Sequence, residues 1–224
     1  TLVSAGELKT LTIGNLDSAS DGDIIVGAIG NTSAADEITS FTLATSGDAN
    51  GGTTVVDMAT IDAAGATFTT FSVDLNGNYG SSDIGIITAE AMGDISITTD
   101  ANGTTFDIDQ FLVADKTTSS VGNVTINAGA AFDGLDGFIT TGATGTVGDI
   151  SITSPGAVTI ADGANETLVD AALTVGNITF NASNAAASFT IGEIEEATTI
   201  GNITFTGTGS IDFDGAPAAT TVGN

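Results

Sequence analysis

The sequence contains no cysteine, no histidine and no tryptophan, and its only basic side chains are those of Lys9 and Lys116. Without histidine or cysteine the chain cannot form a Ser–His or Cys–His pair for nucleophilic catalysis, and zinc and copper sites lack their preferred ligands. No glycine-rich phosphate loop with its lysine occurs. We therefore expect that the chain is not an enzyme.

Basic charge is almost absent, whereas 28 aspartate and glutamate residues give a formal net charge of −26. Binding to nucleic acid depends on Lys and Arg side chains that neutralise phosphates, and anionic membrane surfaces repel an acidic protein. No uncharged apolar run of about 18 residues is present. The sequence predicts neither nucleic-acid binding nor membrane insertion, which leaves cations, neutral glycans and further copies of the chain as candidate partners.

What the sequence does contain is a three-residue motif, an apolar residue followed by Ser or Thr and a second apolar residue. The central hydroxyl residue recurs every 24 to 30 residues, at Thr12, Thr42, Ser72, Ser96, Thr125, Ser151, Thr179 and Thr204. From Gly93 onward each copy is preceded by Gly and then Asn or Asp, as in "GNITF" at 176–180. The alternation and the β-branched residues predict a strand, and Gly and Asn suit a turn that leads into it.

Two further short apolar stretches fall between most consecutive copies, so each period holds roughly three short strands. A period of this length fits one coil of a solenoid, in which neighbouring coils bury each other's apolar residues. The sequence therefore predicts an all-β fold, a right-handed parallel β-helix of about eight coils, as a single domain over residues 1–224. Two β-sandwich domains are the alternative, because their strands also alternate. Helical signals are poor, and the best of them lie at 166–173 and 193–197.

Stacked coils would place like residues in columns, two of them apolar and inward, one of Ser and Thr outward, and one of Asn and Asp outward. The last column contains Asp94, Asn123, Asp149, Asn177 and Asn202. Alternation of Asp with Asn keeps like charges from lying directly next to each other, which would be destabilising.

Calcium is the cation that this sequence suits best, because its preferred ligands are carboxylate and carbonyl oxygens. Three stretches place two carboxylates beside a glycine, and their aspartates are the candidate ligands: Asp21, Asp23, Asp133, Asp136, Asp212 and Asp214. None of the stretches has the EF-hand or β-roll spacing, and Asp-Gly also forms ordinary turns. A further pair, Asp107 and Asp109, has the spacing of one strand face, which is typical of a solvated surface.

Asn31, Asn102 and Asn165 each begin an Asn-x-Ser/Thr sequon in an expected loop and are candidate glycosylation sites. The last residues, Thr220–Asn224, spell the beginning of another copy of the motif. An open solenoid end exposes unpaired backbone groups and apolar side chains. We expect such ends to be covered either by more of a longer array or by neighbouring copies.

The acidic, cysteine-free composition, rich in Thr, Ala, Gly and Asp, and the repeated "GNITF"-type motif resemble those of secreted bacterial and archaeal cell-surface proteins. These are the surface-layer subunits, adhesins and surface filaments. The resemblance implies an extracellular or cell-surface location, structural assembly and calcium dependence. We expect a structural protein that self-assembles head-to-tail or laterally into a filament or surface layer. The alternative is an adhesin or glycan-binding rod that presents a ligand surface.

Overall fold

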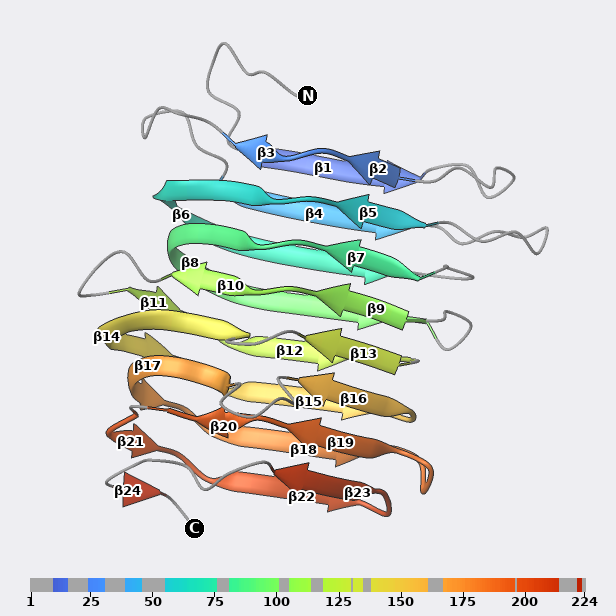
Figure 1. The fold of residues 1–224 in the computed structure, drawn as a ribbon, viewed down its shortest axis with the longest axis vertical. Helices are drawn as coiled ribbons and strands as arrows, with labels where there is room; N and C mark the ends of the chain where they lie inside the picture. The colour runs from blue at the N-terminus through green and yellow to red at the C-terminus, as the bar shows by residue number, and fades with distance from the viewer. Residues whose placement is uncertain are drawn as a thin grey trace, which may run out of the picture.

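The structure is a computed structural model that describes residues 10–15, 24–30, 39–45, 55–75, 81–100, 105–113, 119–129, 131–134, 138–160, 167–195, 197–213 and 221–222. The described chain is a β-solenoid of stacked rungs, and all pairings between its strands are parallel (Figure 1). No helix occurs in these ranges. The predicted all-β solenoid is confirmed.

One side of the solenoid is formed by the strands that carry the repeated motif. They belong to the larger, 16-stranded sheet and are β1 (Thr10–Asn15), β4 (Ser40–Thr45), β6 (Ile61–Leu75), β8 (Ile87–Thr99), β12 (Val124–Asn127), β15 (Ile150–Ser154), β18 (Ile178–Ala182) and β22 (Ile203–Gly207). The register pairs Leu11 with Phe41, Phe41 with Phe71 and Phe71 with Ile95. The three degenerate copies therefore join the same ladder as the later ones.

The opposite side is an eight-stranded sheet. Its strands are β2 (Ile24–Val26), β5 (Val56–Met58), β7 (Ser82–Ile84), β9 (Thr105–Ile108), β13 (Ala131–Gly134), β16 (Ala157–Ile160), β19 (Ser188–Ile191) and β23 (Ser210–Phe213). The remaining strands belong to the larger sheet and connect the smaller sheet of each coil to the next motif strand. They are β3 (Ile29–Gly30), β10 (Phe111–Val113), β11 (Ser120–Val121), β14 (Ile139–Val147), β17 (Thr167–Val175), β20 (Glu193–Ile194), β21 (Thr199–Ile200) and β24 (Thr221–Val222).

The solenoid has about six turns, slightly fewer than the eight coils expected from the sequence. The smaller sheet does stack eight strands, one for each copy of the motif. The first and last rungs are incomplete within the described residues. The ranges 16–23 and 31–38 of the first rung and the range 214–220 after the last one lie outside the description. The two segments with the best helical signals form strands β17 and β20, since stacking in the sheet outweighs a weak local preference.

The inward positions of the motif strands form the two predicted apolar columns. Ile178 and Phe180 have no exposed surface, and their partners in the inner rungs are equally buried. Phenylalanine rings continue the contact from rung to rung: Phe41 stacks on Phe71 with centroids 5.2 Å apart, and Phe111 meets Phe138 edge-on at 5.4 Å. The described apolar residues form one core that runs along the stack.

The glycine that opens each later motif is required by the short distance between rungs. A Cβ atom on Gly122, Gly148, Gly176 or Gly201 would lie 2.6 to 2.8 Å from the carbonyl carbon of the equivalent glycine in the preceding rung. Within the described residues only Gly207 has a positive φ, of 108°. These glycines therefore do not use the positive φ that glycine permits, and the missing side chain lets neighbouring backbones approach.

The Asn/Asp column is a ladder of bonds between rungs. The backbone N–H of Asn123 donates to Oδ1 of Asp94 at 2.9 Å, and that of Asp149 donates to Oδ1 of Asn123 at 3.0 Å. The same bond joins Asn177 to Asp149 at 2.7 Å and Asn202 to Asn177 at 3.1 Å. Each side-chain oxygen thus satisfies a backbone donor just before the next motif strand, which explains why Asn and Asp fill this column.

Gly148→Ala is expected to lower the free energy of unfolding by roughly 1–3 kcal/mol, the usual effect of a methyl group forced into a closely packed space. Gly27→Ala is the matched control, because its Cβ would meet no atom within 4 Å. We expect the control to be neutral or slightly stabilising, since alanine restricts the unfolded chain. Urea unfolding of both variants measures the difference. Equal stability of the two variants would contradict the close approach of the rungs.

Asn123→Asp would place three carboxylates in consecutive rungs, between Asp94 and Asp149, and is expected to lower the free energy of unfolding by up to about 1 kcal/mol at low salt. Asn202→Asp adds the same charge beside Asn177 and should have a smaller effect. At 1 M NaCl the screening length falls to about 3 Å, so the difference between the variants should shrink. A difference that does not respond to salt would exclude charge repulsion as its cause.

Candidate functional site

The predicted calcium ligands are only partly within the described residues. Asp133 lies on β13 and Asp212 on β23, in one column of the smaller sheet but separated by Thr159 and Thr190 on the two intervening strands. The structure therefore does not bring these two carboxylates together. Four of the predicted ligands lie outside the described residues: Asp21, Asp23, Asp136 and Asp214. The candidate glycosylation sites Asn31, Asn102 and Asn165 also lie outside them.

A column of aspartates runs along the outer face of the smaller sheet. Asp57, Asp83, Asp107 and Asp133 occupy the same position on the successive strands β5, β7, β9 and β13. Each points outward because the residues on either side of an outward position in a strand face the core. Adjacent strands lie about 4.8 Å apart, so the parallel register sets carboxylates directly beside one another, which is destabilising.

Burial and the neighbouring charges make the two central carboxyl groups, those of Asp83 and Asp107, harder to ionise. Partial burial, followed by repulsion from Asp133, Asp83 and Asp109, raises the pKa of Asp107 to about 6. Its Oδ1 atom is buried and has no hydrogen-bond partner. The pKa of Asp83 is also raised, first by burial and then by Asp109 and Asp57. Asp107 therefore takes up a proton at about pH 6, well above the pH at which an ordinary aspartate does.

The chemistry open to this column is proton exchange near neutral pH and attraction of cations. The described residues contain no group of three or more His, Cys, Asp or Glu side chains that could hold a metal ion. Specific calcium binding therefore remains a prediction, and four of its six candidate ligands lie outside the described residues.

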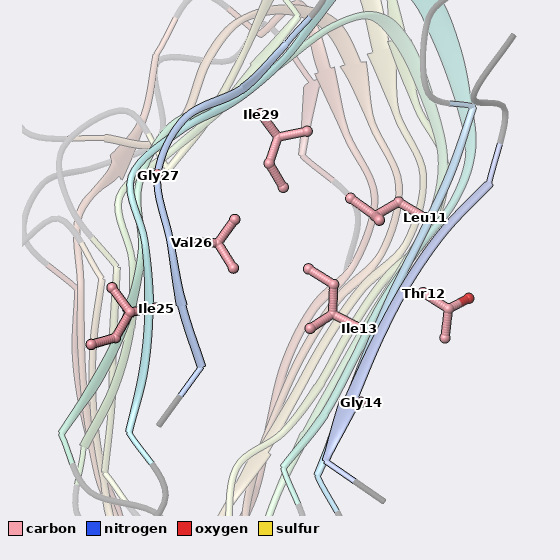
Figure 2. Close-up of a pocket in the computed structure, with 8 residues that line it drawn as sticks. All are labelled: Leu11, Thr12, Ile13, Gly14, Ile25, Val26, Gly27 and Ile29. Carbon is pink, nitrogen blue, oxygen red and sulfur yellow. The ribbon is translucent and has the colours of Figure 1, made fainter. Parts of the chain in front are cut away.

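A separate apolar hollow of about 520 Å³ opens at the first rung (Figure 2). Leu11 and Ile13 of β1 and Val26 of β2 point into the space between the two strands, whereas Thr12 and Ile25 point away from it. The complete lining is Leu11, Thr12, Ile13, Gly14, Ile25, Val26, Gly27 and Ile29. The hollow is the open cross-section of the solenoid core, and its chemistry suits an apolar side chain rather than a polar substrate.

Comparison with known proteins finds no matching family model, no matching curated protein and no matching solved structure. The described residues include no helix long and apolar enough to cross a membrane.

Asp107 and Asp109 stand out in the sequence as a pair, but the column to which Asp107 belongs was not predicted from it. The signal was present, because Asp57, Asp83, Asp107 and Asp133 follow one another at intervals of 26, 24 and 26 residues. These intervals match the period of the motif, and aligning the second strand of each coil would have placed the four aspartates in one column. The raised pKa values of Asp83 and Asp107 depend first on burial, which the spacing alone does not give.

Asp107→Asn is expected to stabilise the protein more at pH 7.5 than at pH 5. The folded-state pKa of about 6 lies above the ordinary value of 3.8, so the proton on Asp107 stabilises the fold at low pH, and this contribution is lost as the pH rises through 6. Urea unfolding at both pH values measures the difference between variant and parent. Asp212→Asn, at an exposed position beside Thr190, controls for net charge. A difference for Asp107→Asn that does not change with pH would contradict the raised pKa.

Proposed function

We propose that the chain is a structural protein of the extracellular space or cell surface, and that its copies self-associate into a filament or surface layer. The observation that supports self-association is the exposure of core residues at the two end rungs. Ile203 and Phe205 in the last rung are only partly buried, whereas Ile178 and Phe180, their partners one rung earlier, are completely buried. Leu11 and Ile13 in the first rung are partly buried in the same way.

End rungs of this kind favour assembly for two physical reasons. The outer edges of β1 and β22 each present a row of backbone groups with no stacked motif strand beyond them in the described chain, and such edges are templates for pairing. Covering the exposed core residues also removes apolar surface from water. The extracellular location and the calcium dependence rest on the resemblance of the composition and repeat to surface proteins.

The alternative function, an adhesin or glycan-binding rod, is favoured by the outer face of the later motif strands. Serine, threonine and asparagine fill its outward positions, and Asp149 is the only charged residue among them: Asn123, Thr125, Asn127, Asp149, Ser151, Thr153, Asn177, Thr179, Asn181, Asn202, Thr204 and Thr206. Hydroxyl and amide groups both donate and accept hydrogen bonds, which suits a neutral glycan. In this alternative the protein remains a single rod.

Electron microscopy of the purified chain, with calcium and with a chelator, tests the proposed function. We expect filaments or sheets, favoured by calcium because divalent cations reduce repulsion between copies that each carry a charge of −26. Monodisperse rods under both conditions, at concentrations up to the solubility limit, would contradict self-association. If such rods co-sediment with an insoluble neutral polysaccharide, the alternative function is supported.

A further inference from the structure

We infer that copies of this chain join rung on rung, so that β22 and β23 of one copy pack directly on β1 and β2 of the next. This inference rests on the proposed self-association and names the surfaces that form the contact. The partner at each end is a second copy of the same chain, and the solenoid core runs on from one copy into the other.

The parallel register makes the first rung a suitable continuation of the last. Inside the chain each rung stacks on the preceding one with like residues in line, and the end rungs carry the same types at the same motif positions. Leu11 corresponds to Ile203 and Ile13 to Phe205, both pairs apolar and inward. Thr12 corresponds to Thr204, the outward hydroxyl position. A second copy placed with its strands parallel therefore extends every one of these columns by one rung.

The shapes of the two ends complement each other. The first rung is hollow, because its inward residues leave a space of about 520 Å³ between β1 and β2. The last rung carries two partly exposed phenylalanines, Phe205 on β22 and Phe213 on β23. In the proposed contact Phe205 stacks on Ile13 of the next copy and Phe213 stacks on Val26. Both rings therefore lie against the hollow and cover its apolar lining.

The distribution of charge also favours the ends over the sides. The sequences of β1, β2, β3 and β22 contain no charged residue, and β23 contains only Asp212. The column register places Asp212 beside Ile25 of the next copy, which is uncharged and 71% exposed. A side contact through the smaller sheet would instead bring the aspartate column against a strongly acidic neighbour. End contacts are thus the ones in which the described strands set no two carboxylates together.

The Asn/Asp ladder reaches Asn202 within the described residues. The residue in the corresponding position of the first rung is Thr10, which is uncharged. Because the contact is heterologous and repeats along the solenoid axis, it does not close and produces a filament.

The absence of cysteine allows a direct test by disulfide cross-linking of the double variant T12C/T204C. Within one copy the two sites are seven rungs, or about 34 Å, apart and cannot be bridged. In the proposed contact they are neighbours about 4.8 Å apart between Cα atoms, which is within the range for a disulfide. We expect mild oxidation to give a ladder of covalent dimers, trimers and larger species on a denaturing gel without reductant.

The matched control is T42C/T204C, because Thr42 lies one rung inside the first and its Cα atom would be about 10 Å from that of residue 204 in the neighbouring copy. This variant should give at least tenfold less cross-linked product. Adding Phe205→Asp to T12C/T204C should reduce the ladder at least tenfold as well, since a carboxylate would enter the apolar hollow. Circular dichroism verifies that this variant keeps its β structure.

Three results would overturn the inference. Equal cross-linking of T12C/T204C and T42C/T204C would show that contacts between copies have no fixed register. Filaments or sheets in the microscope with only monomers on the gel would leave the proposed self-association in place and exclude the rung-on-rung contact. Isolated rods that also fail to cross-link would contradict both proposals.

Discussion

The interaction on which this structure depends is the parallel, in-register stacking of one rung on the next. A single rung has apolar residues on its inner side but nothing of its own to cover them from above and below, so its core exists only between neighbours. The backbone hydrogen bonds of the two sheets, the ring contact between Phe41 and Phe71, and the bonds of the Asn/Asp ladder all cross from one rung to another. Stability is therefore shared along the stack.

In-register stacking of like residues stabilises apolar columns and destabilises charged ones. Placing isoleucine over isoleucine, as at Ile150 and Ile178, gives a continuous core, whereas placing aspartate over aspartate gives repulsion. The motif side avoids the repulsion by alternating Asp149 with Asn123 and Asn177. The smaller sheet does not, and burial together with this repulsion raises the pKa of Asp107 at the centre of its column to about 6. One geometric rule thus produces both the continuous core and the unfavourable charge contacts of the described chain.

The same stacking has no internal reason to stop. Even the last described residues follow it, because Val222 pairs in register with Ile200 and begins a further rung. The end rungs combine strands that carry no charged residue except Asp212 with partly exposed core residues and an apolar hollow. These features connect the repeat to the structural role proposed for the protein.

The sequence by itself determined the repeat, the all-β solenoid, the identity of the inward and outward columns and the order of strands within a coil. These follow from period and alternation, because a strand of alternating residues repeated every 24 to 30 residues buries its apolar side only by stacking. Even the weak first copies at Leu11 and Phe41 could be placed by their spacing.

Only the tertiary structure decided how closely the rungs approach, and three conclusions depend on that distance. It showed that Gly148 and Gly176 lie where a side chain would collide with the backbone of the preceding rung. It turned the separate residues Asp57, Asp83, Asp107 and Asp133 into one column with raised pKa values at its centre. It also placed Asp133 and Asp212, which belong to two different predicted calcium stretches, in one column of the smaller sheet with Thr159 and Thr190 between them. The physical reason is common to all three: burial and charge repulsion are set by distances between coils, and spacing along the chain does not contain them.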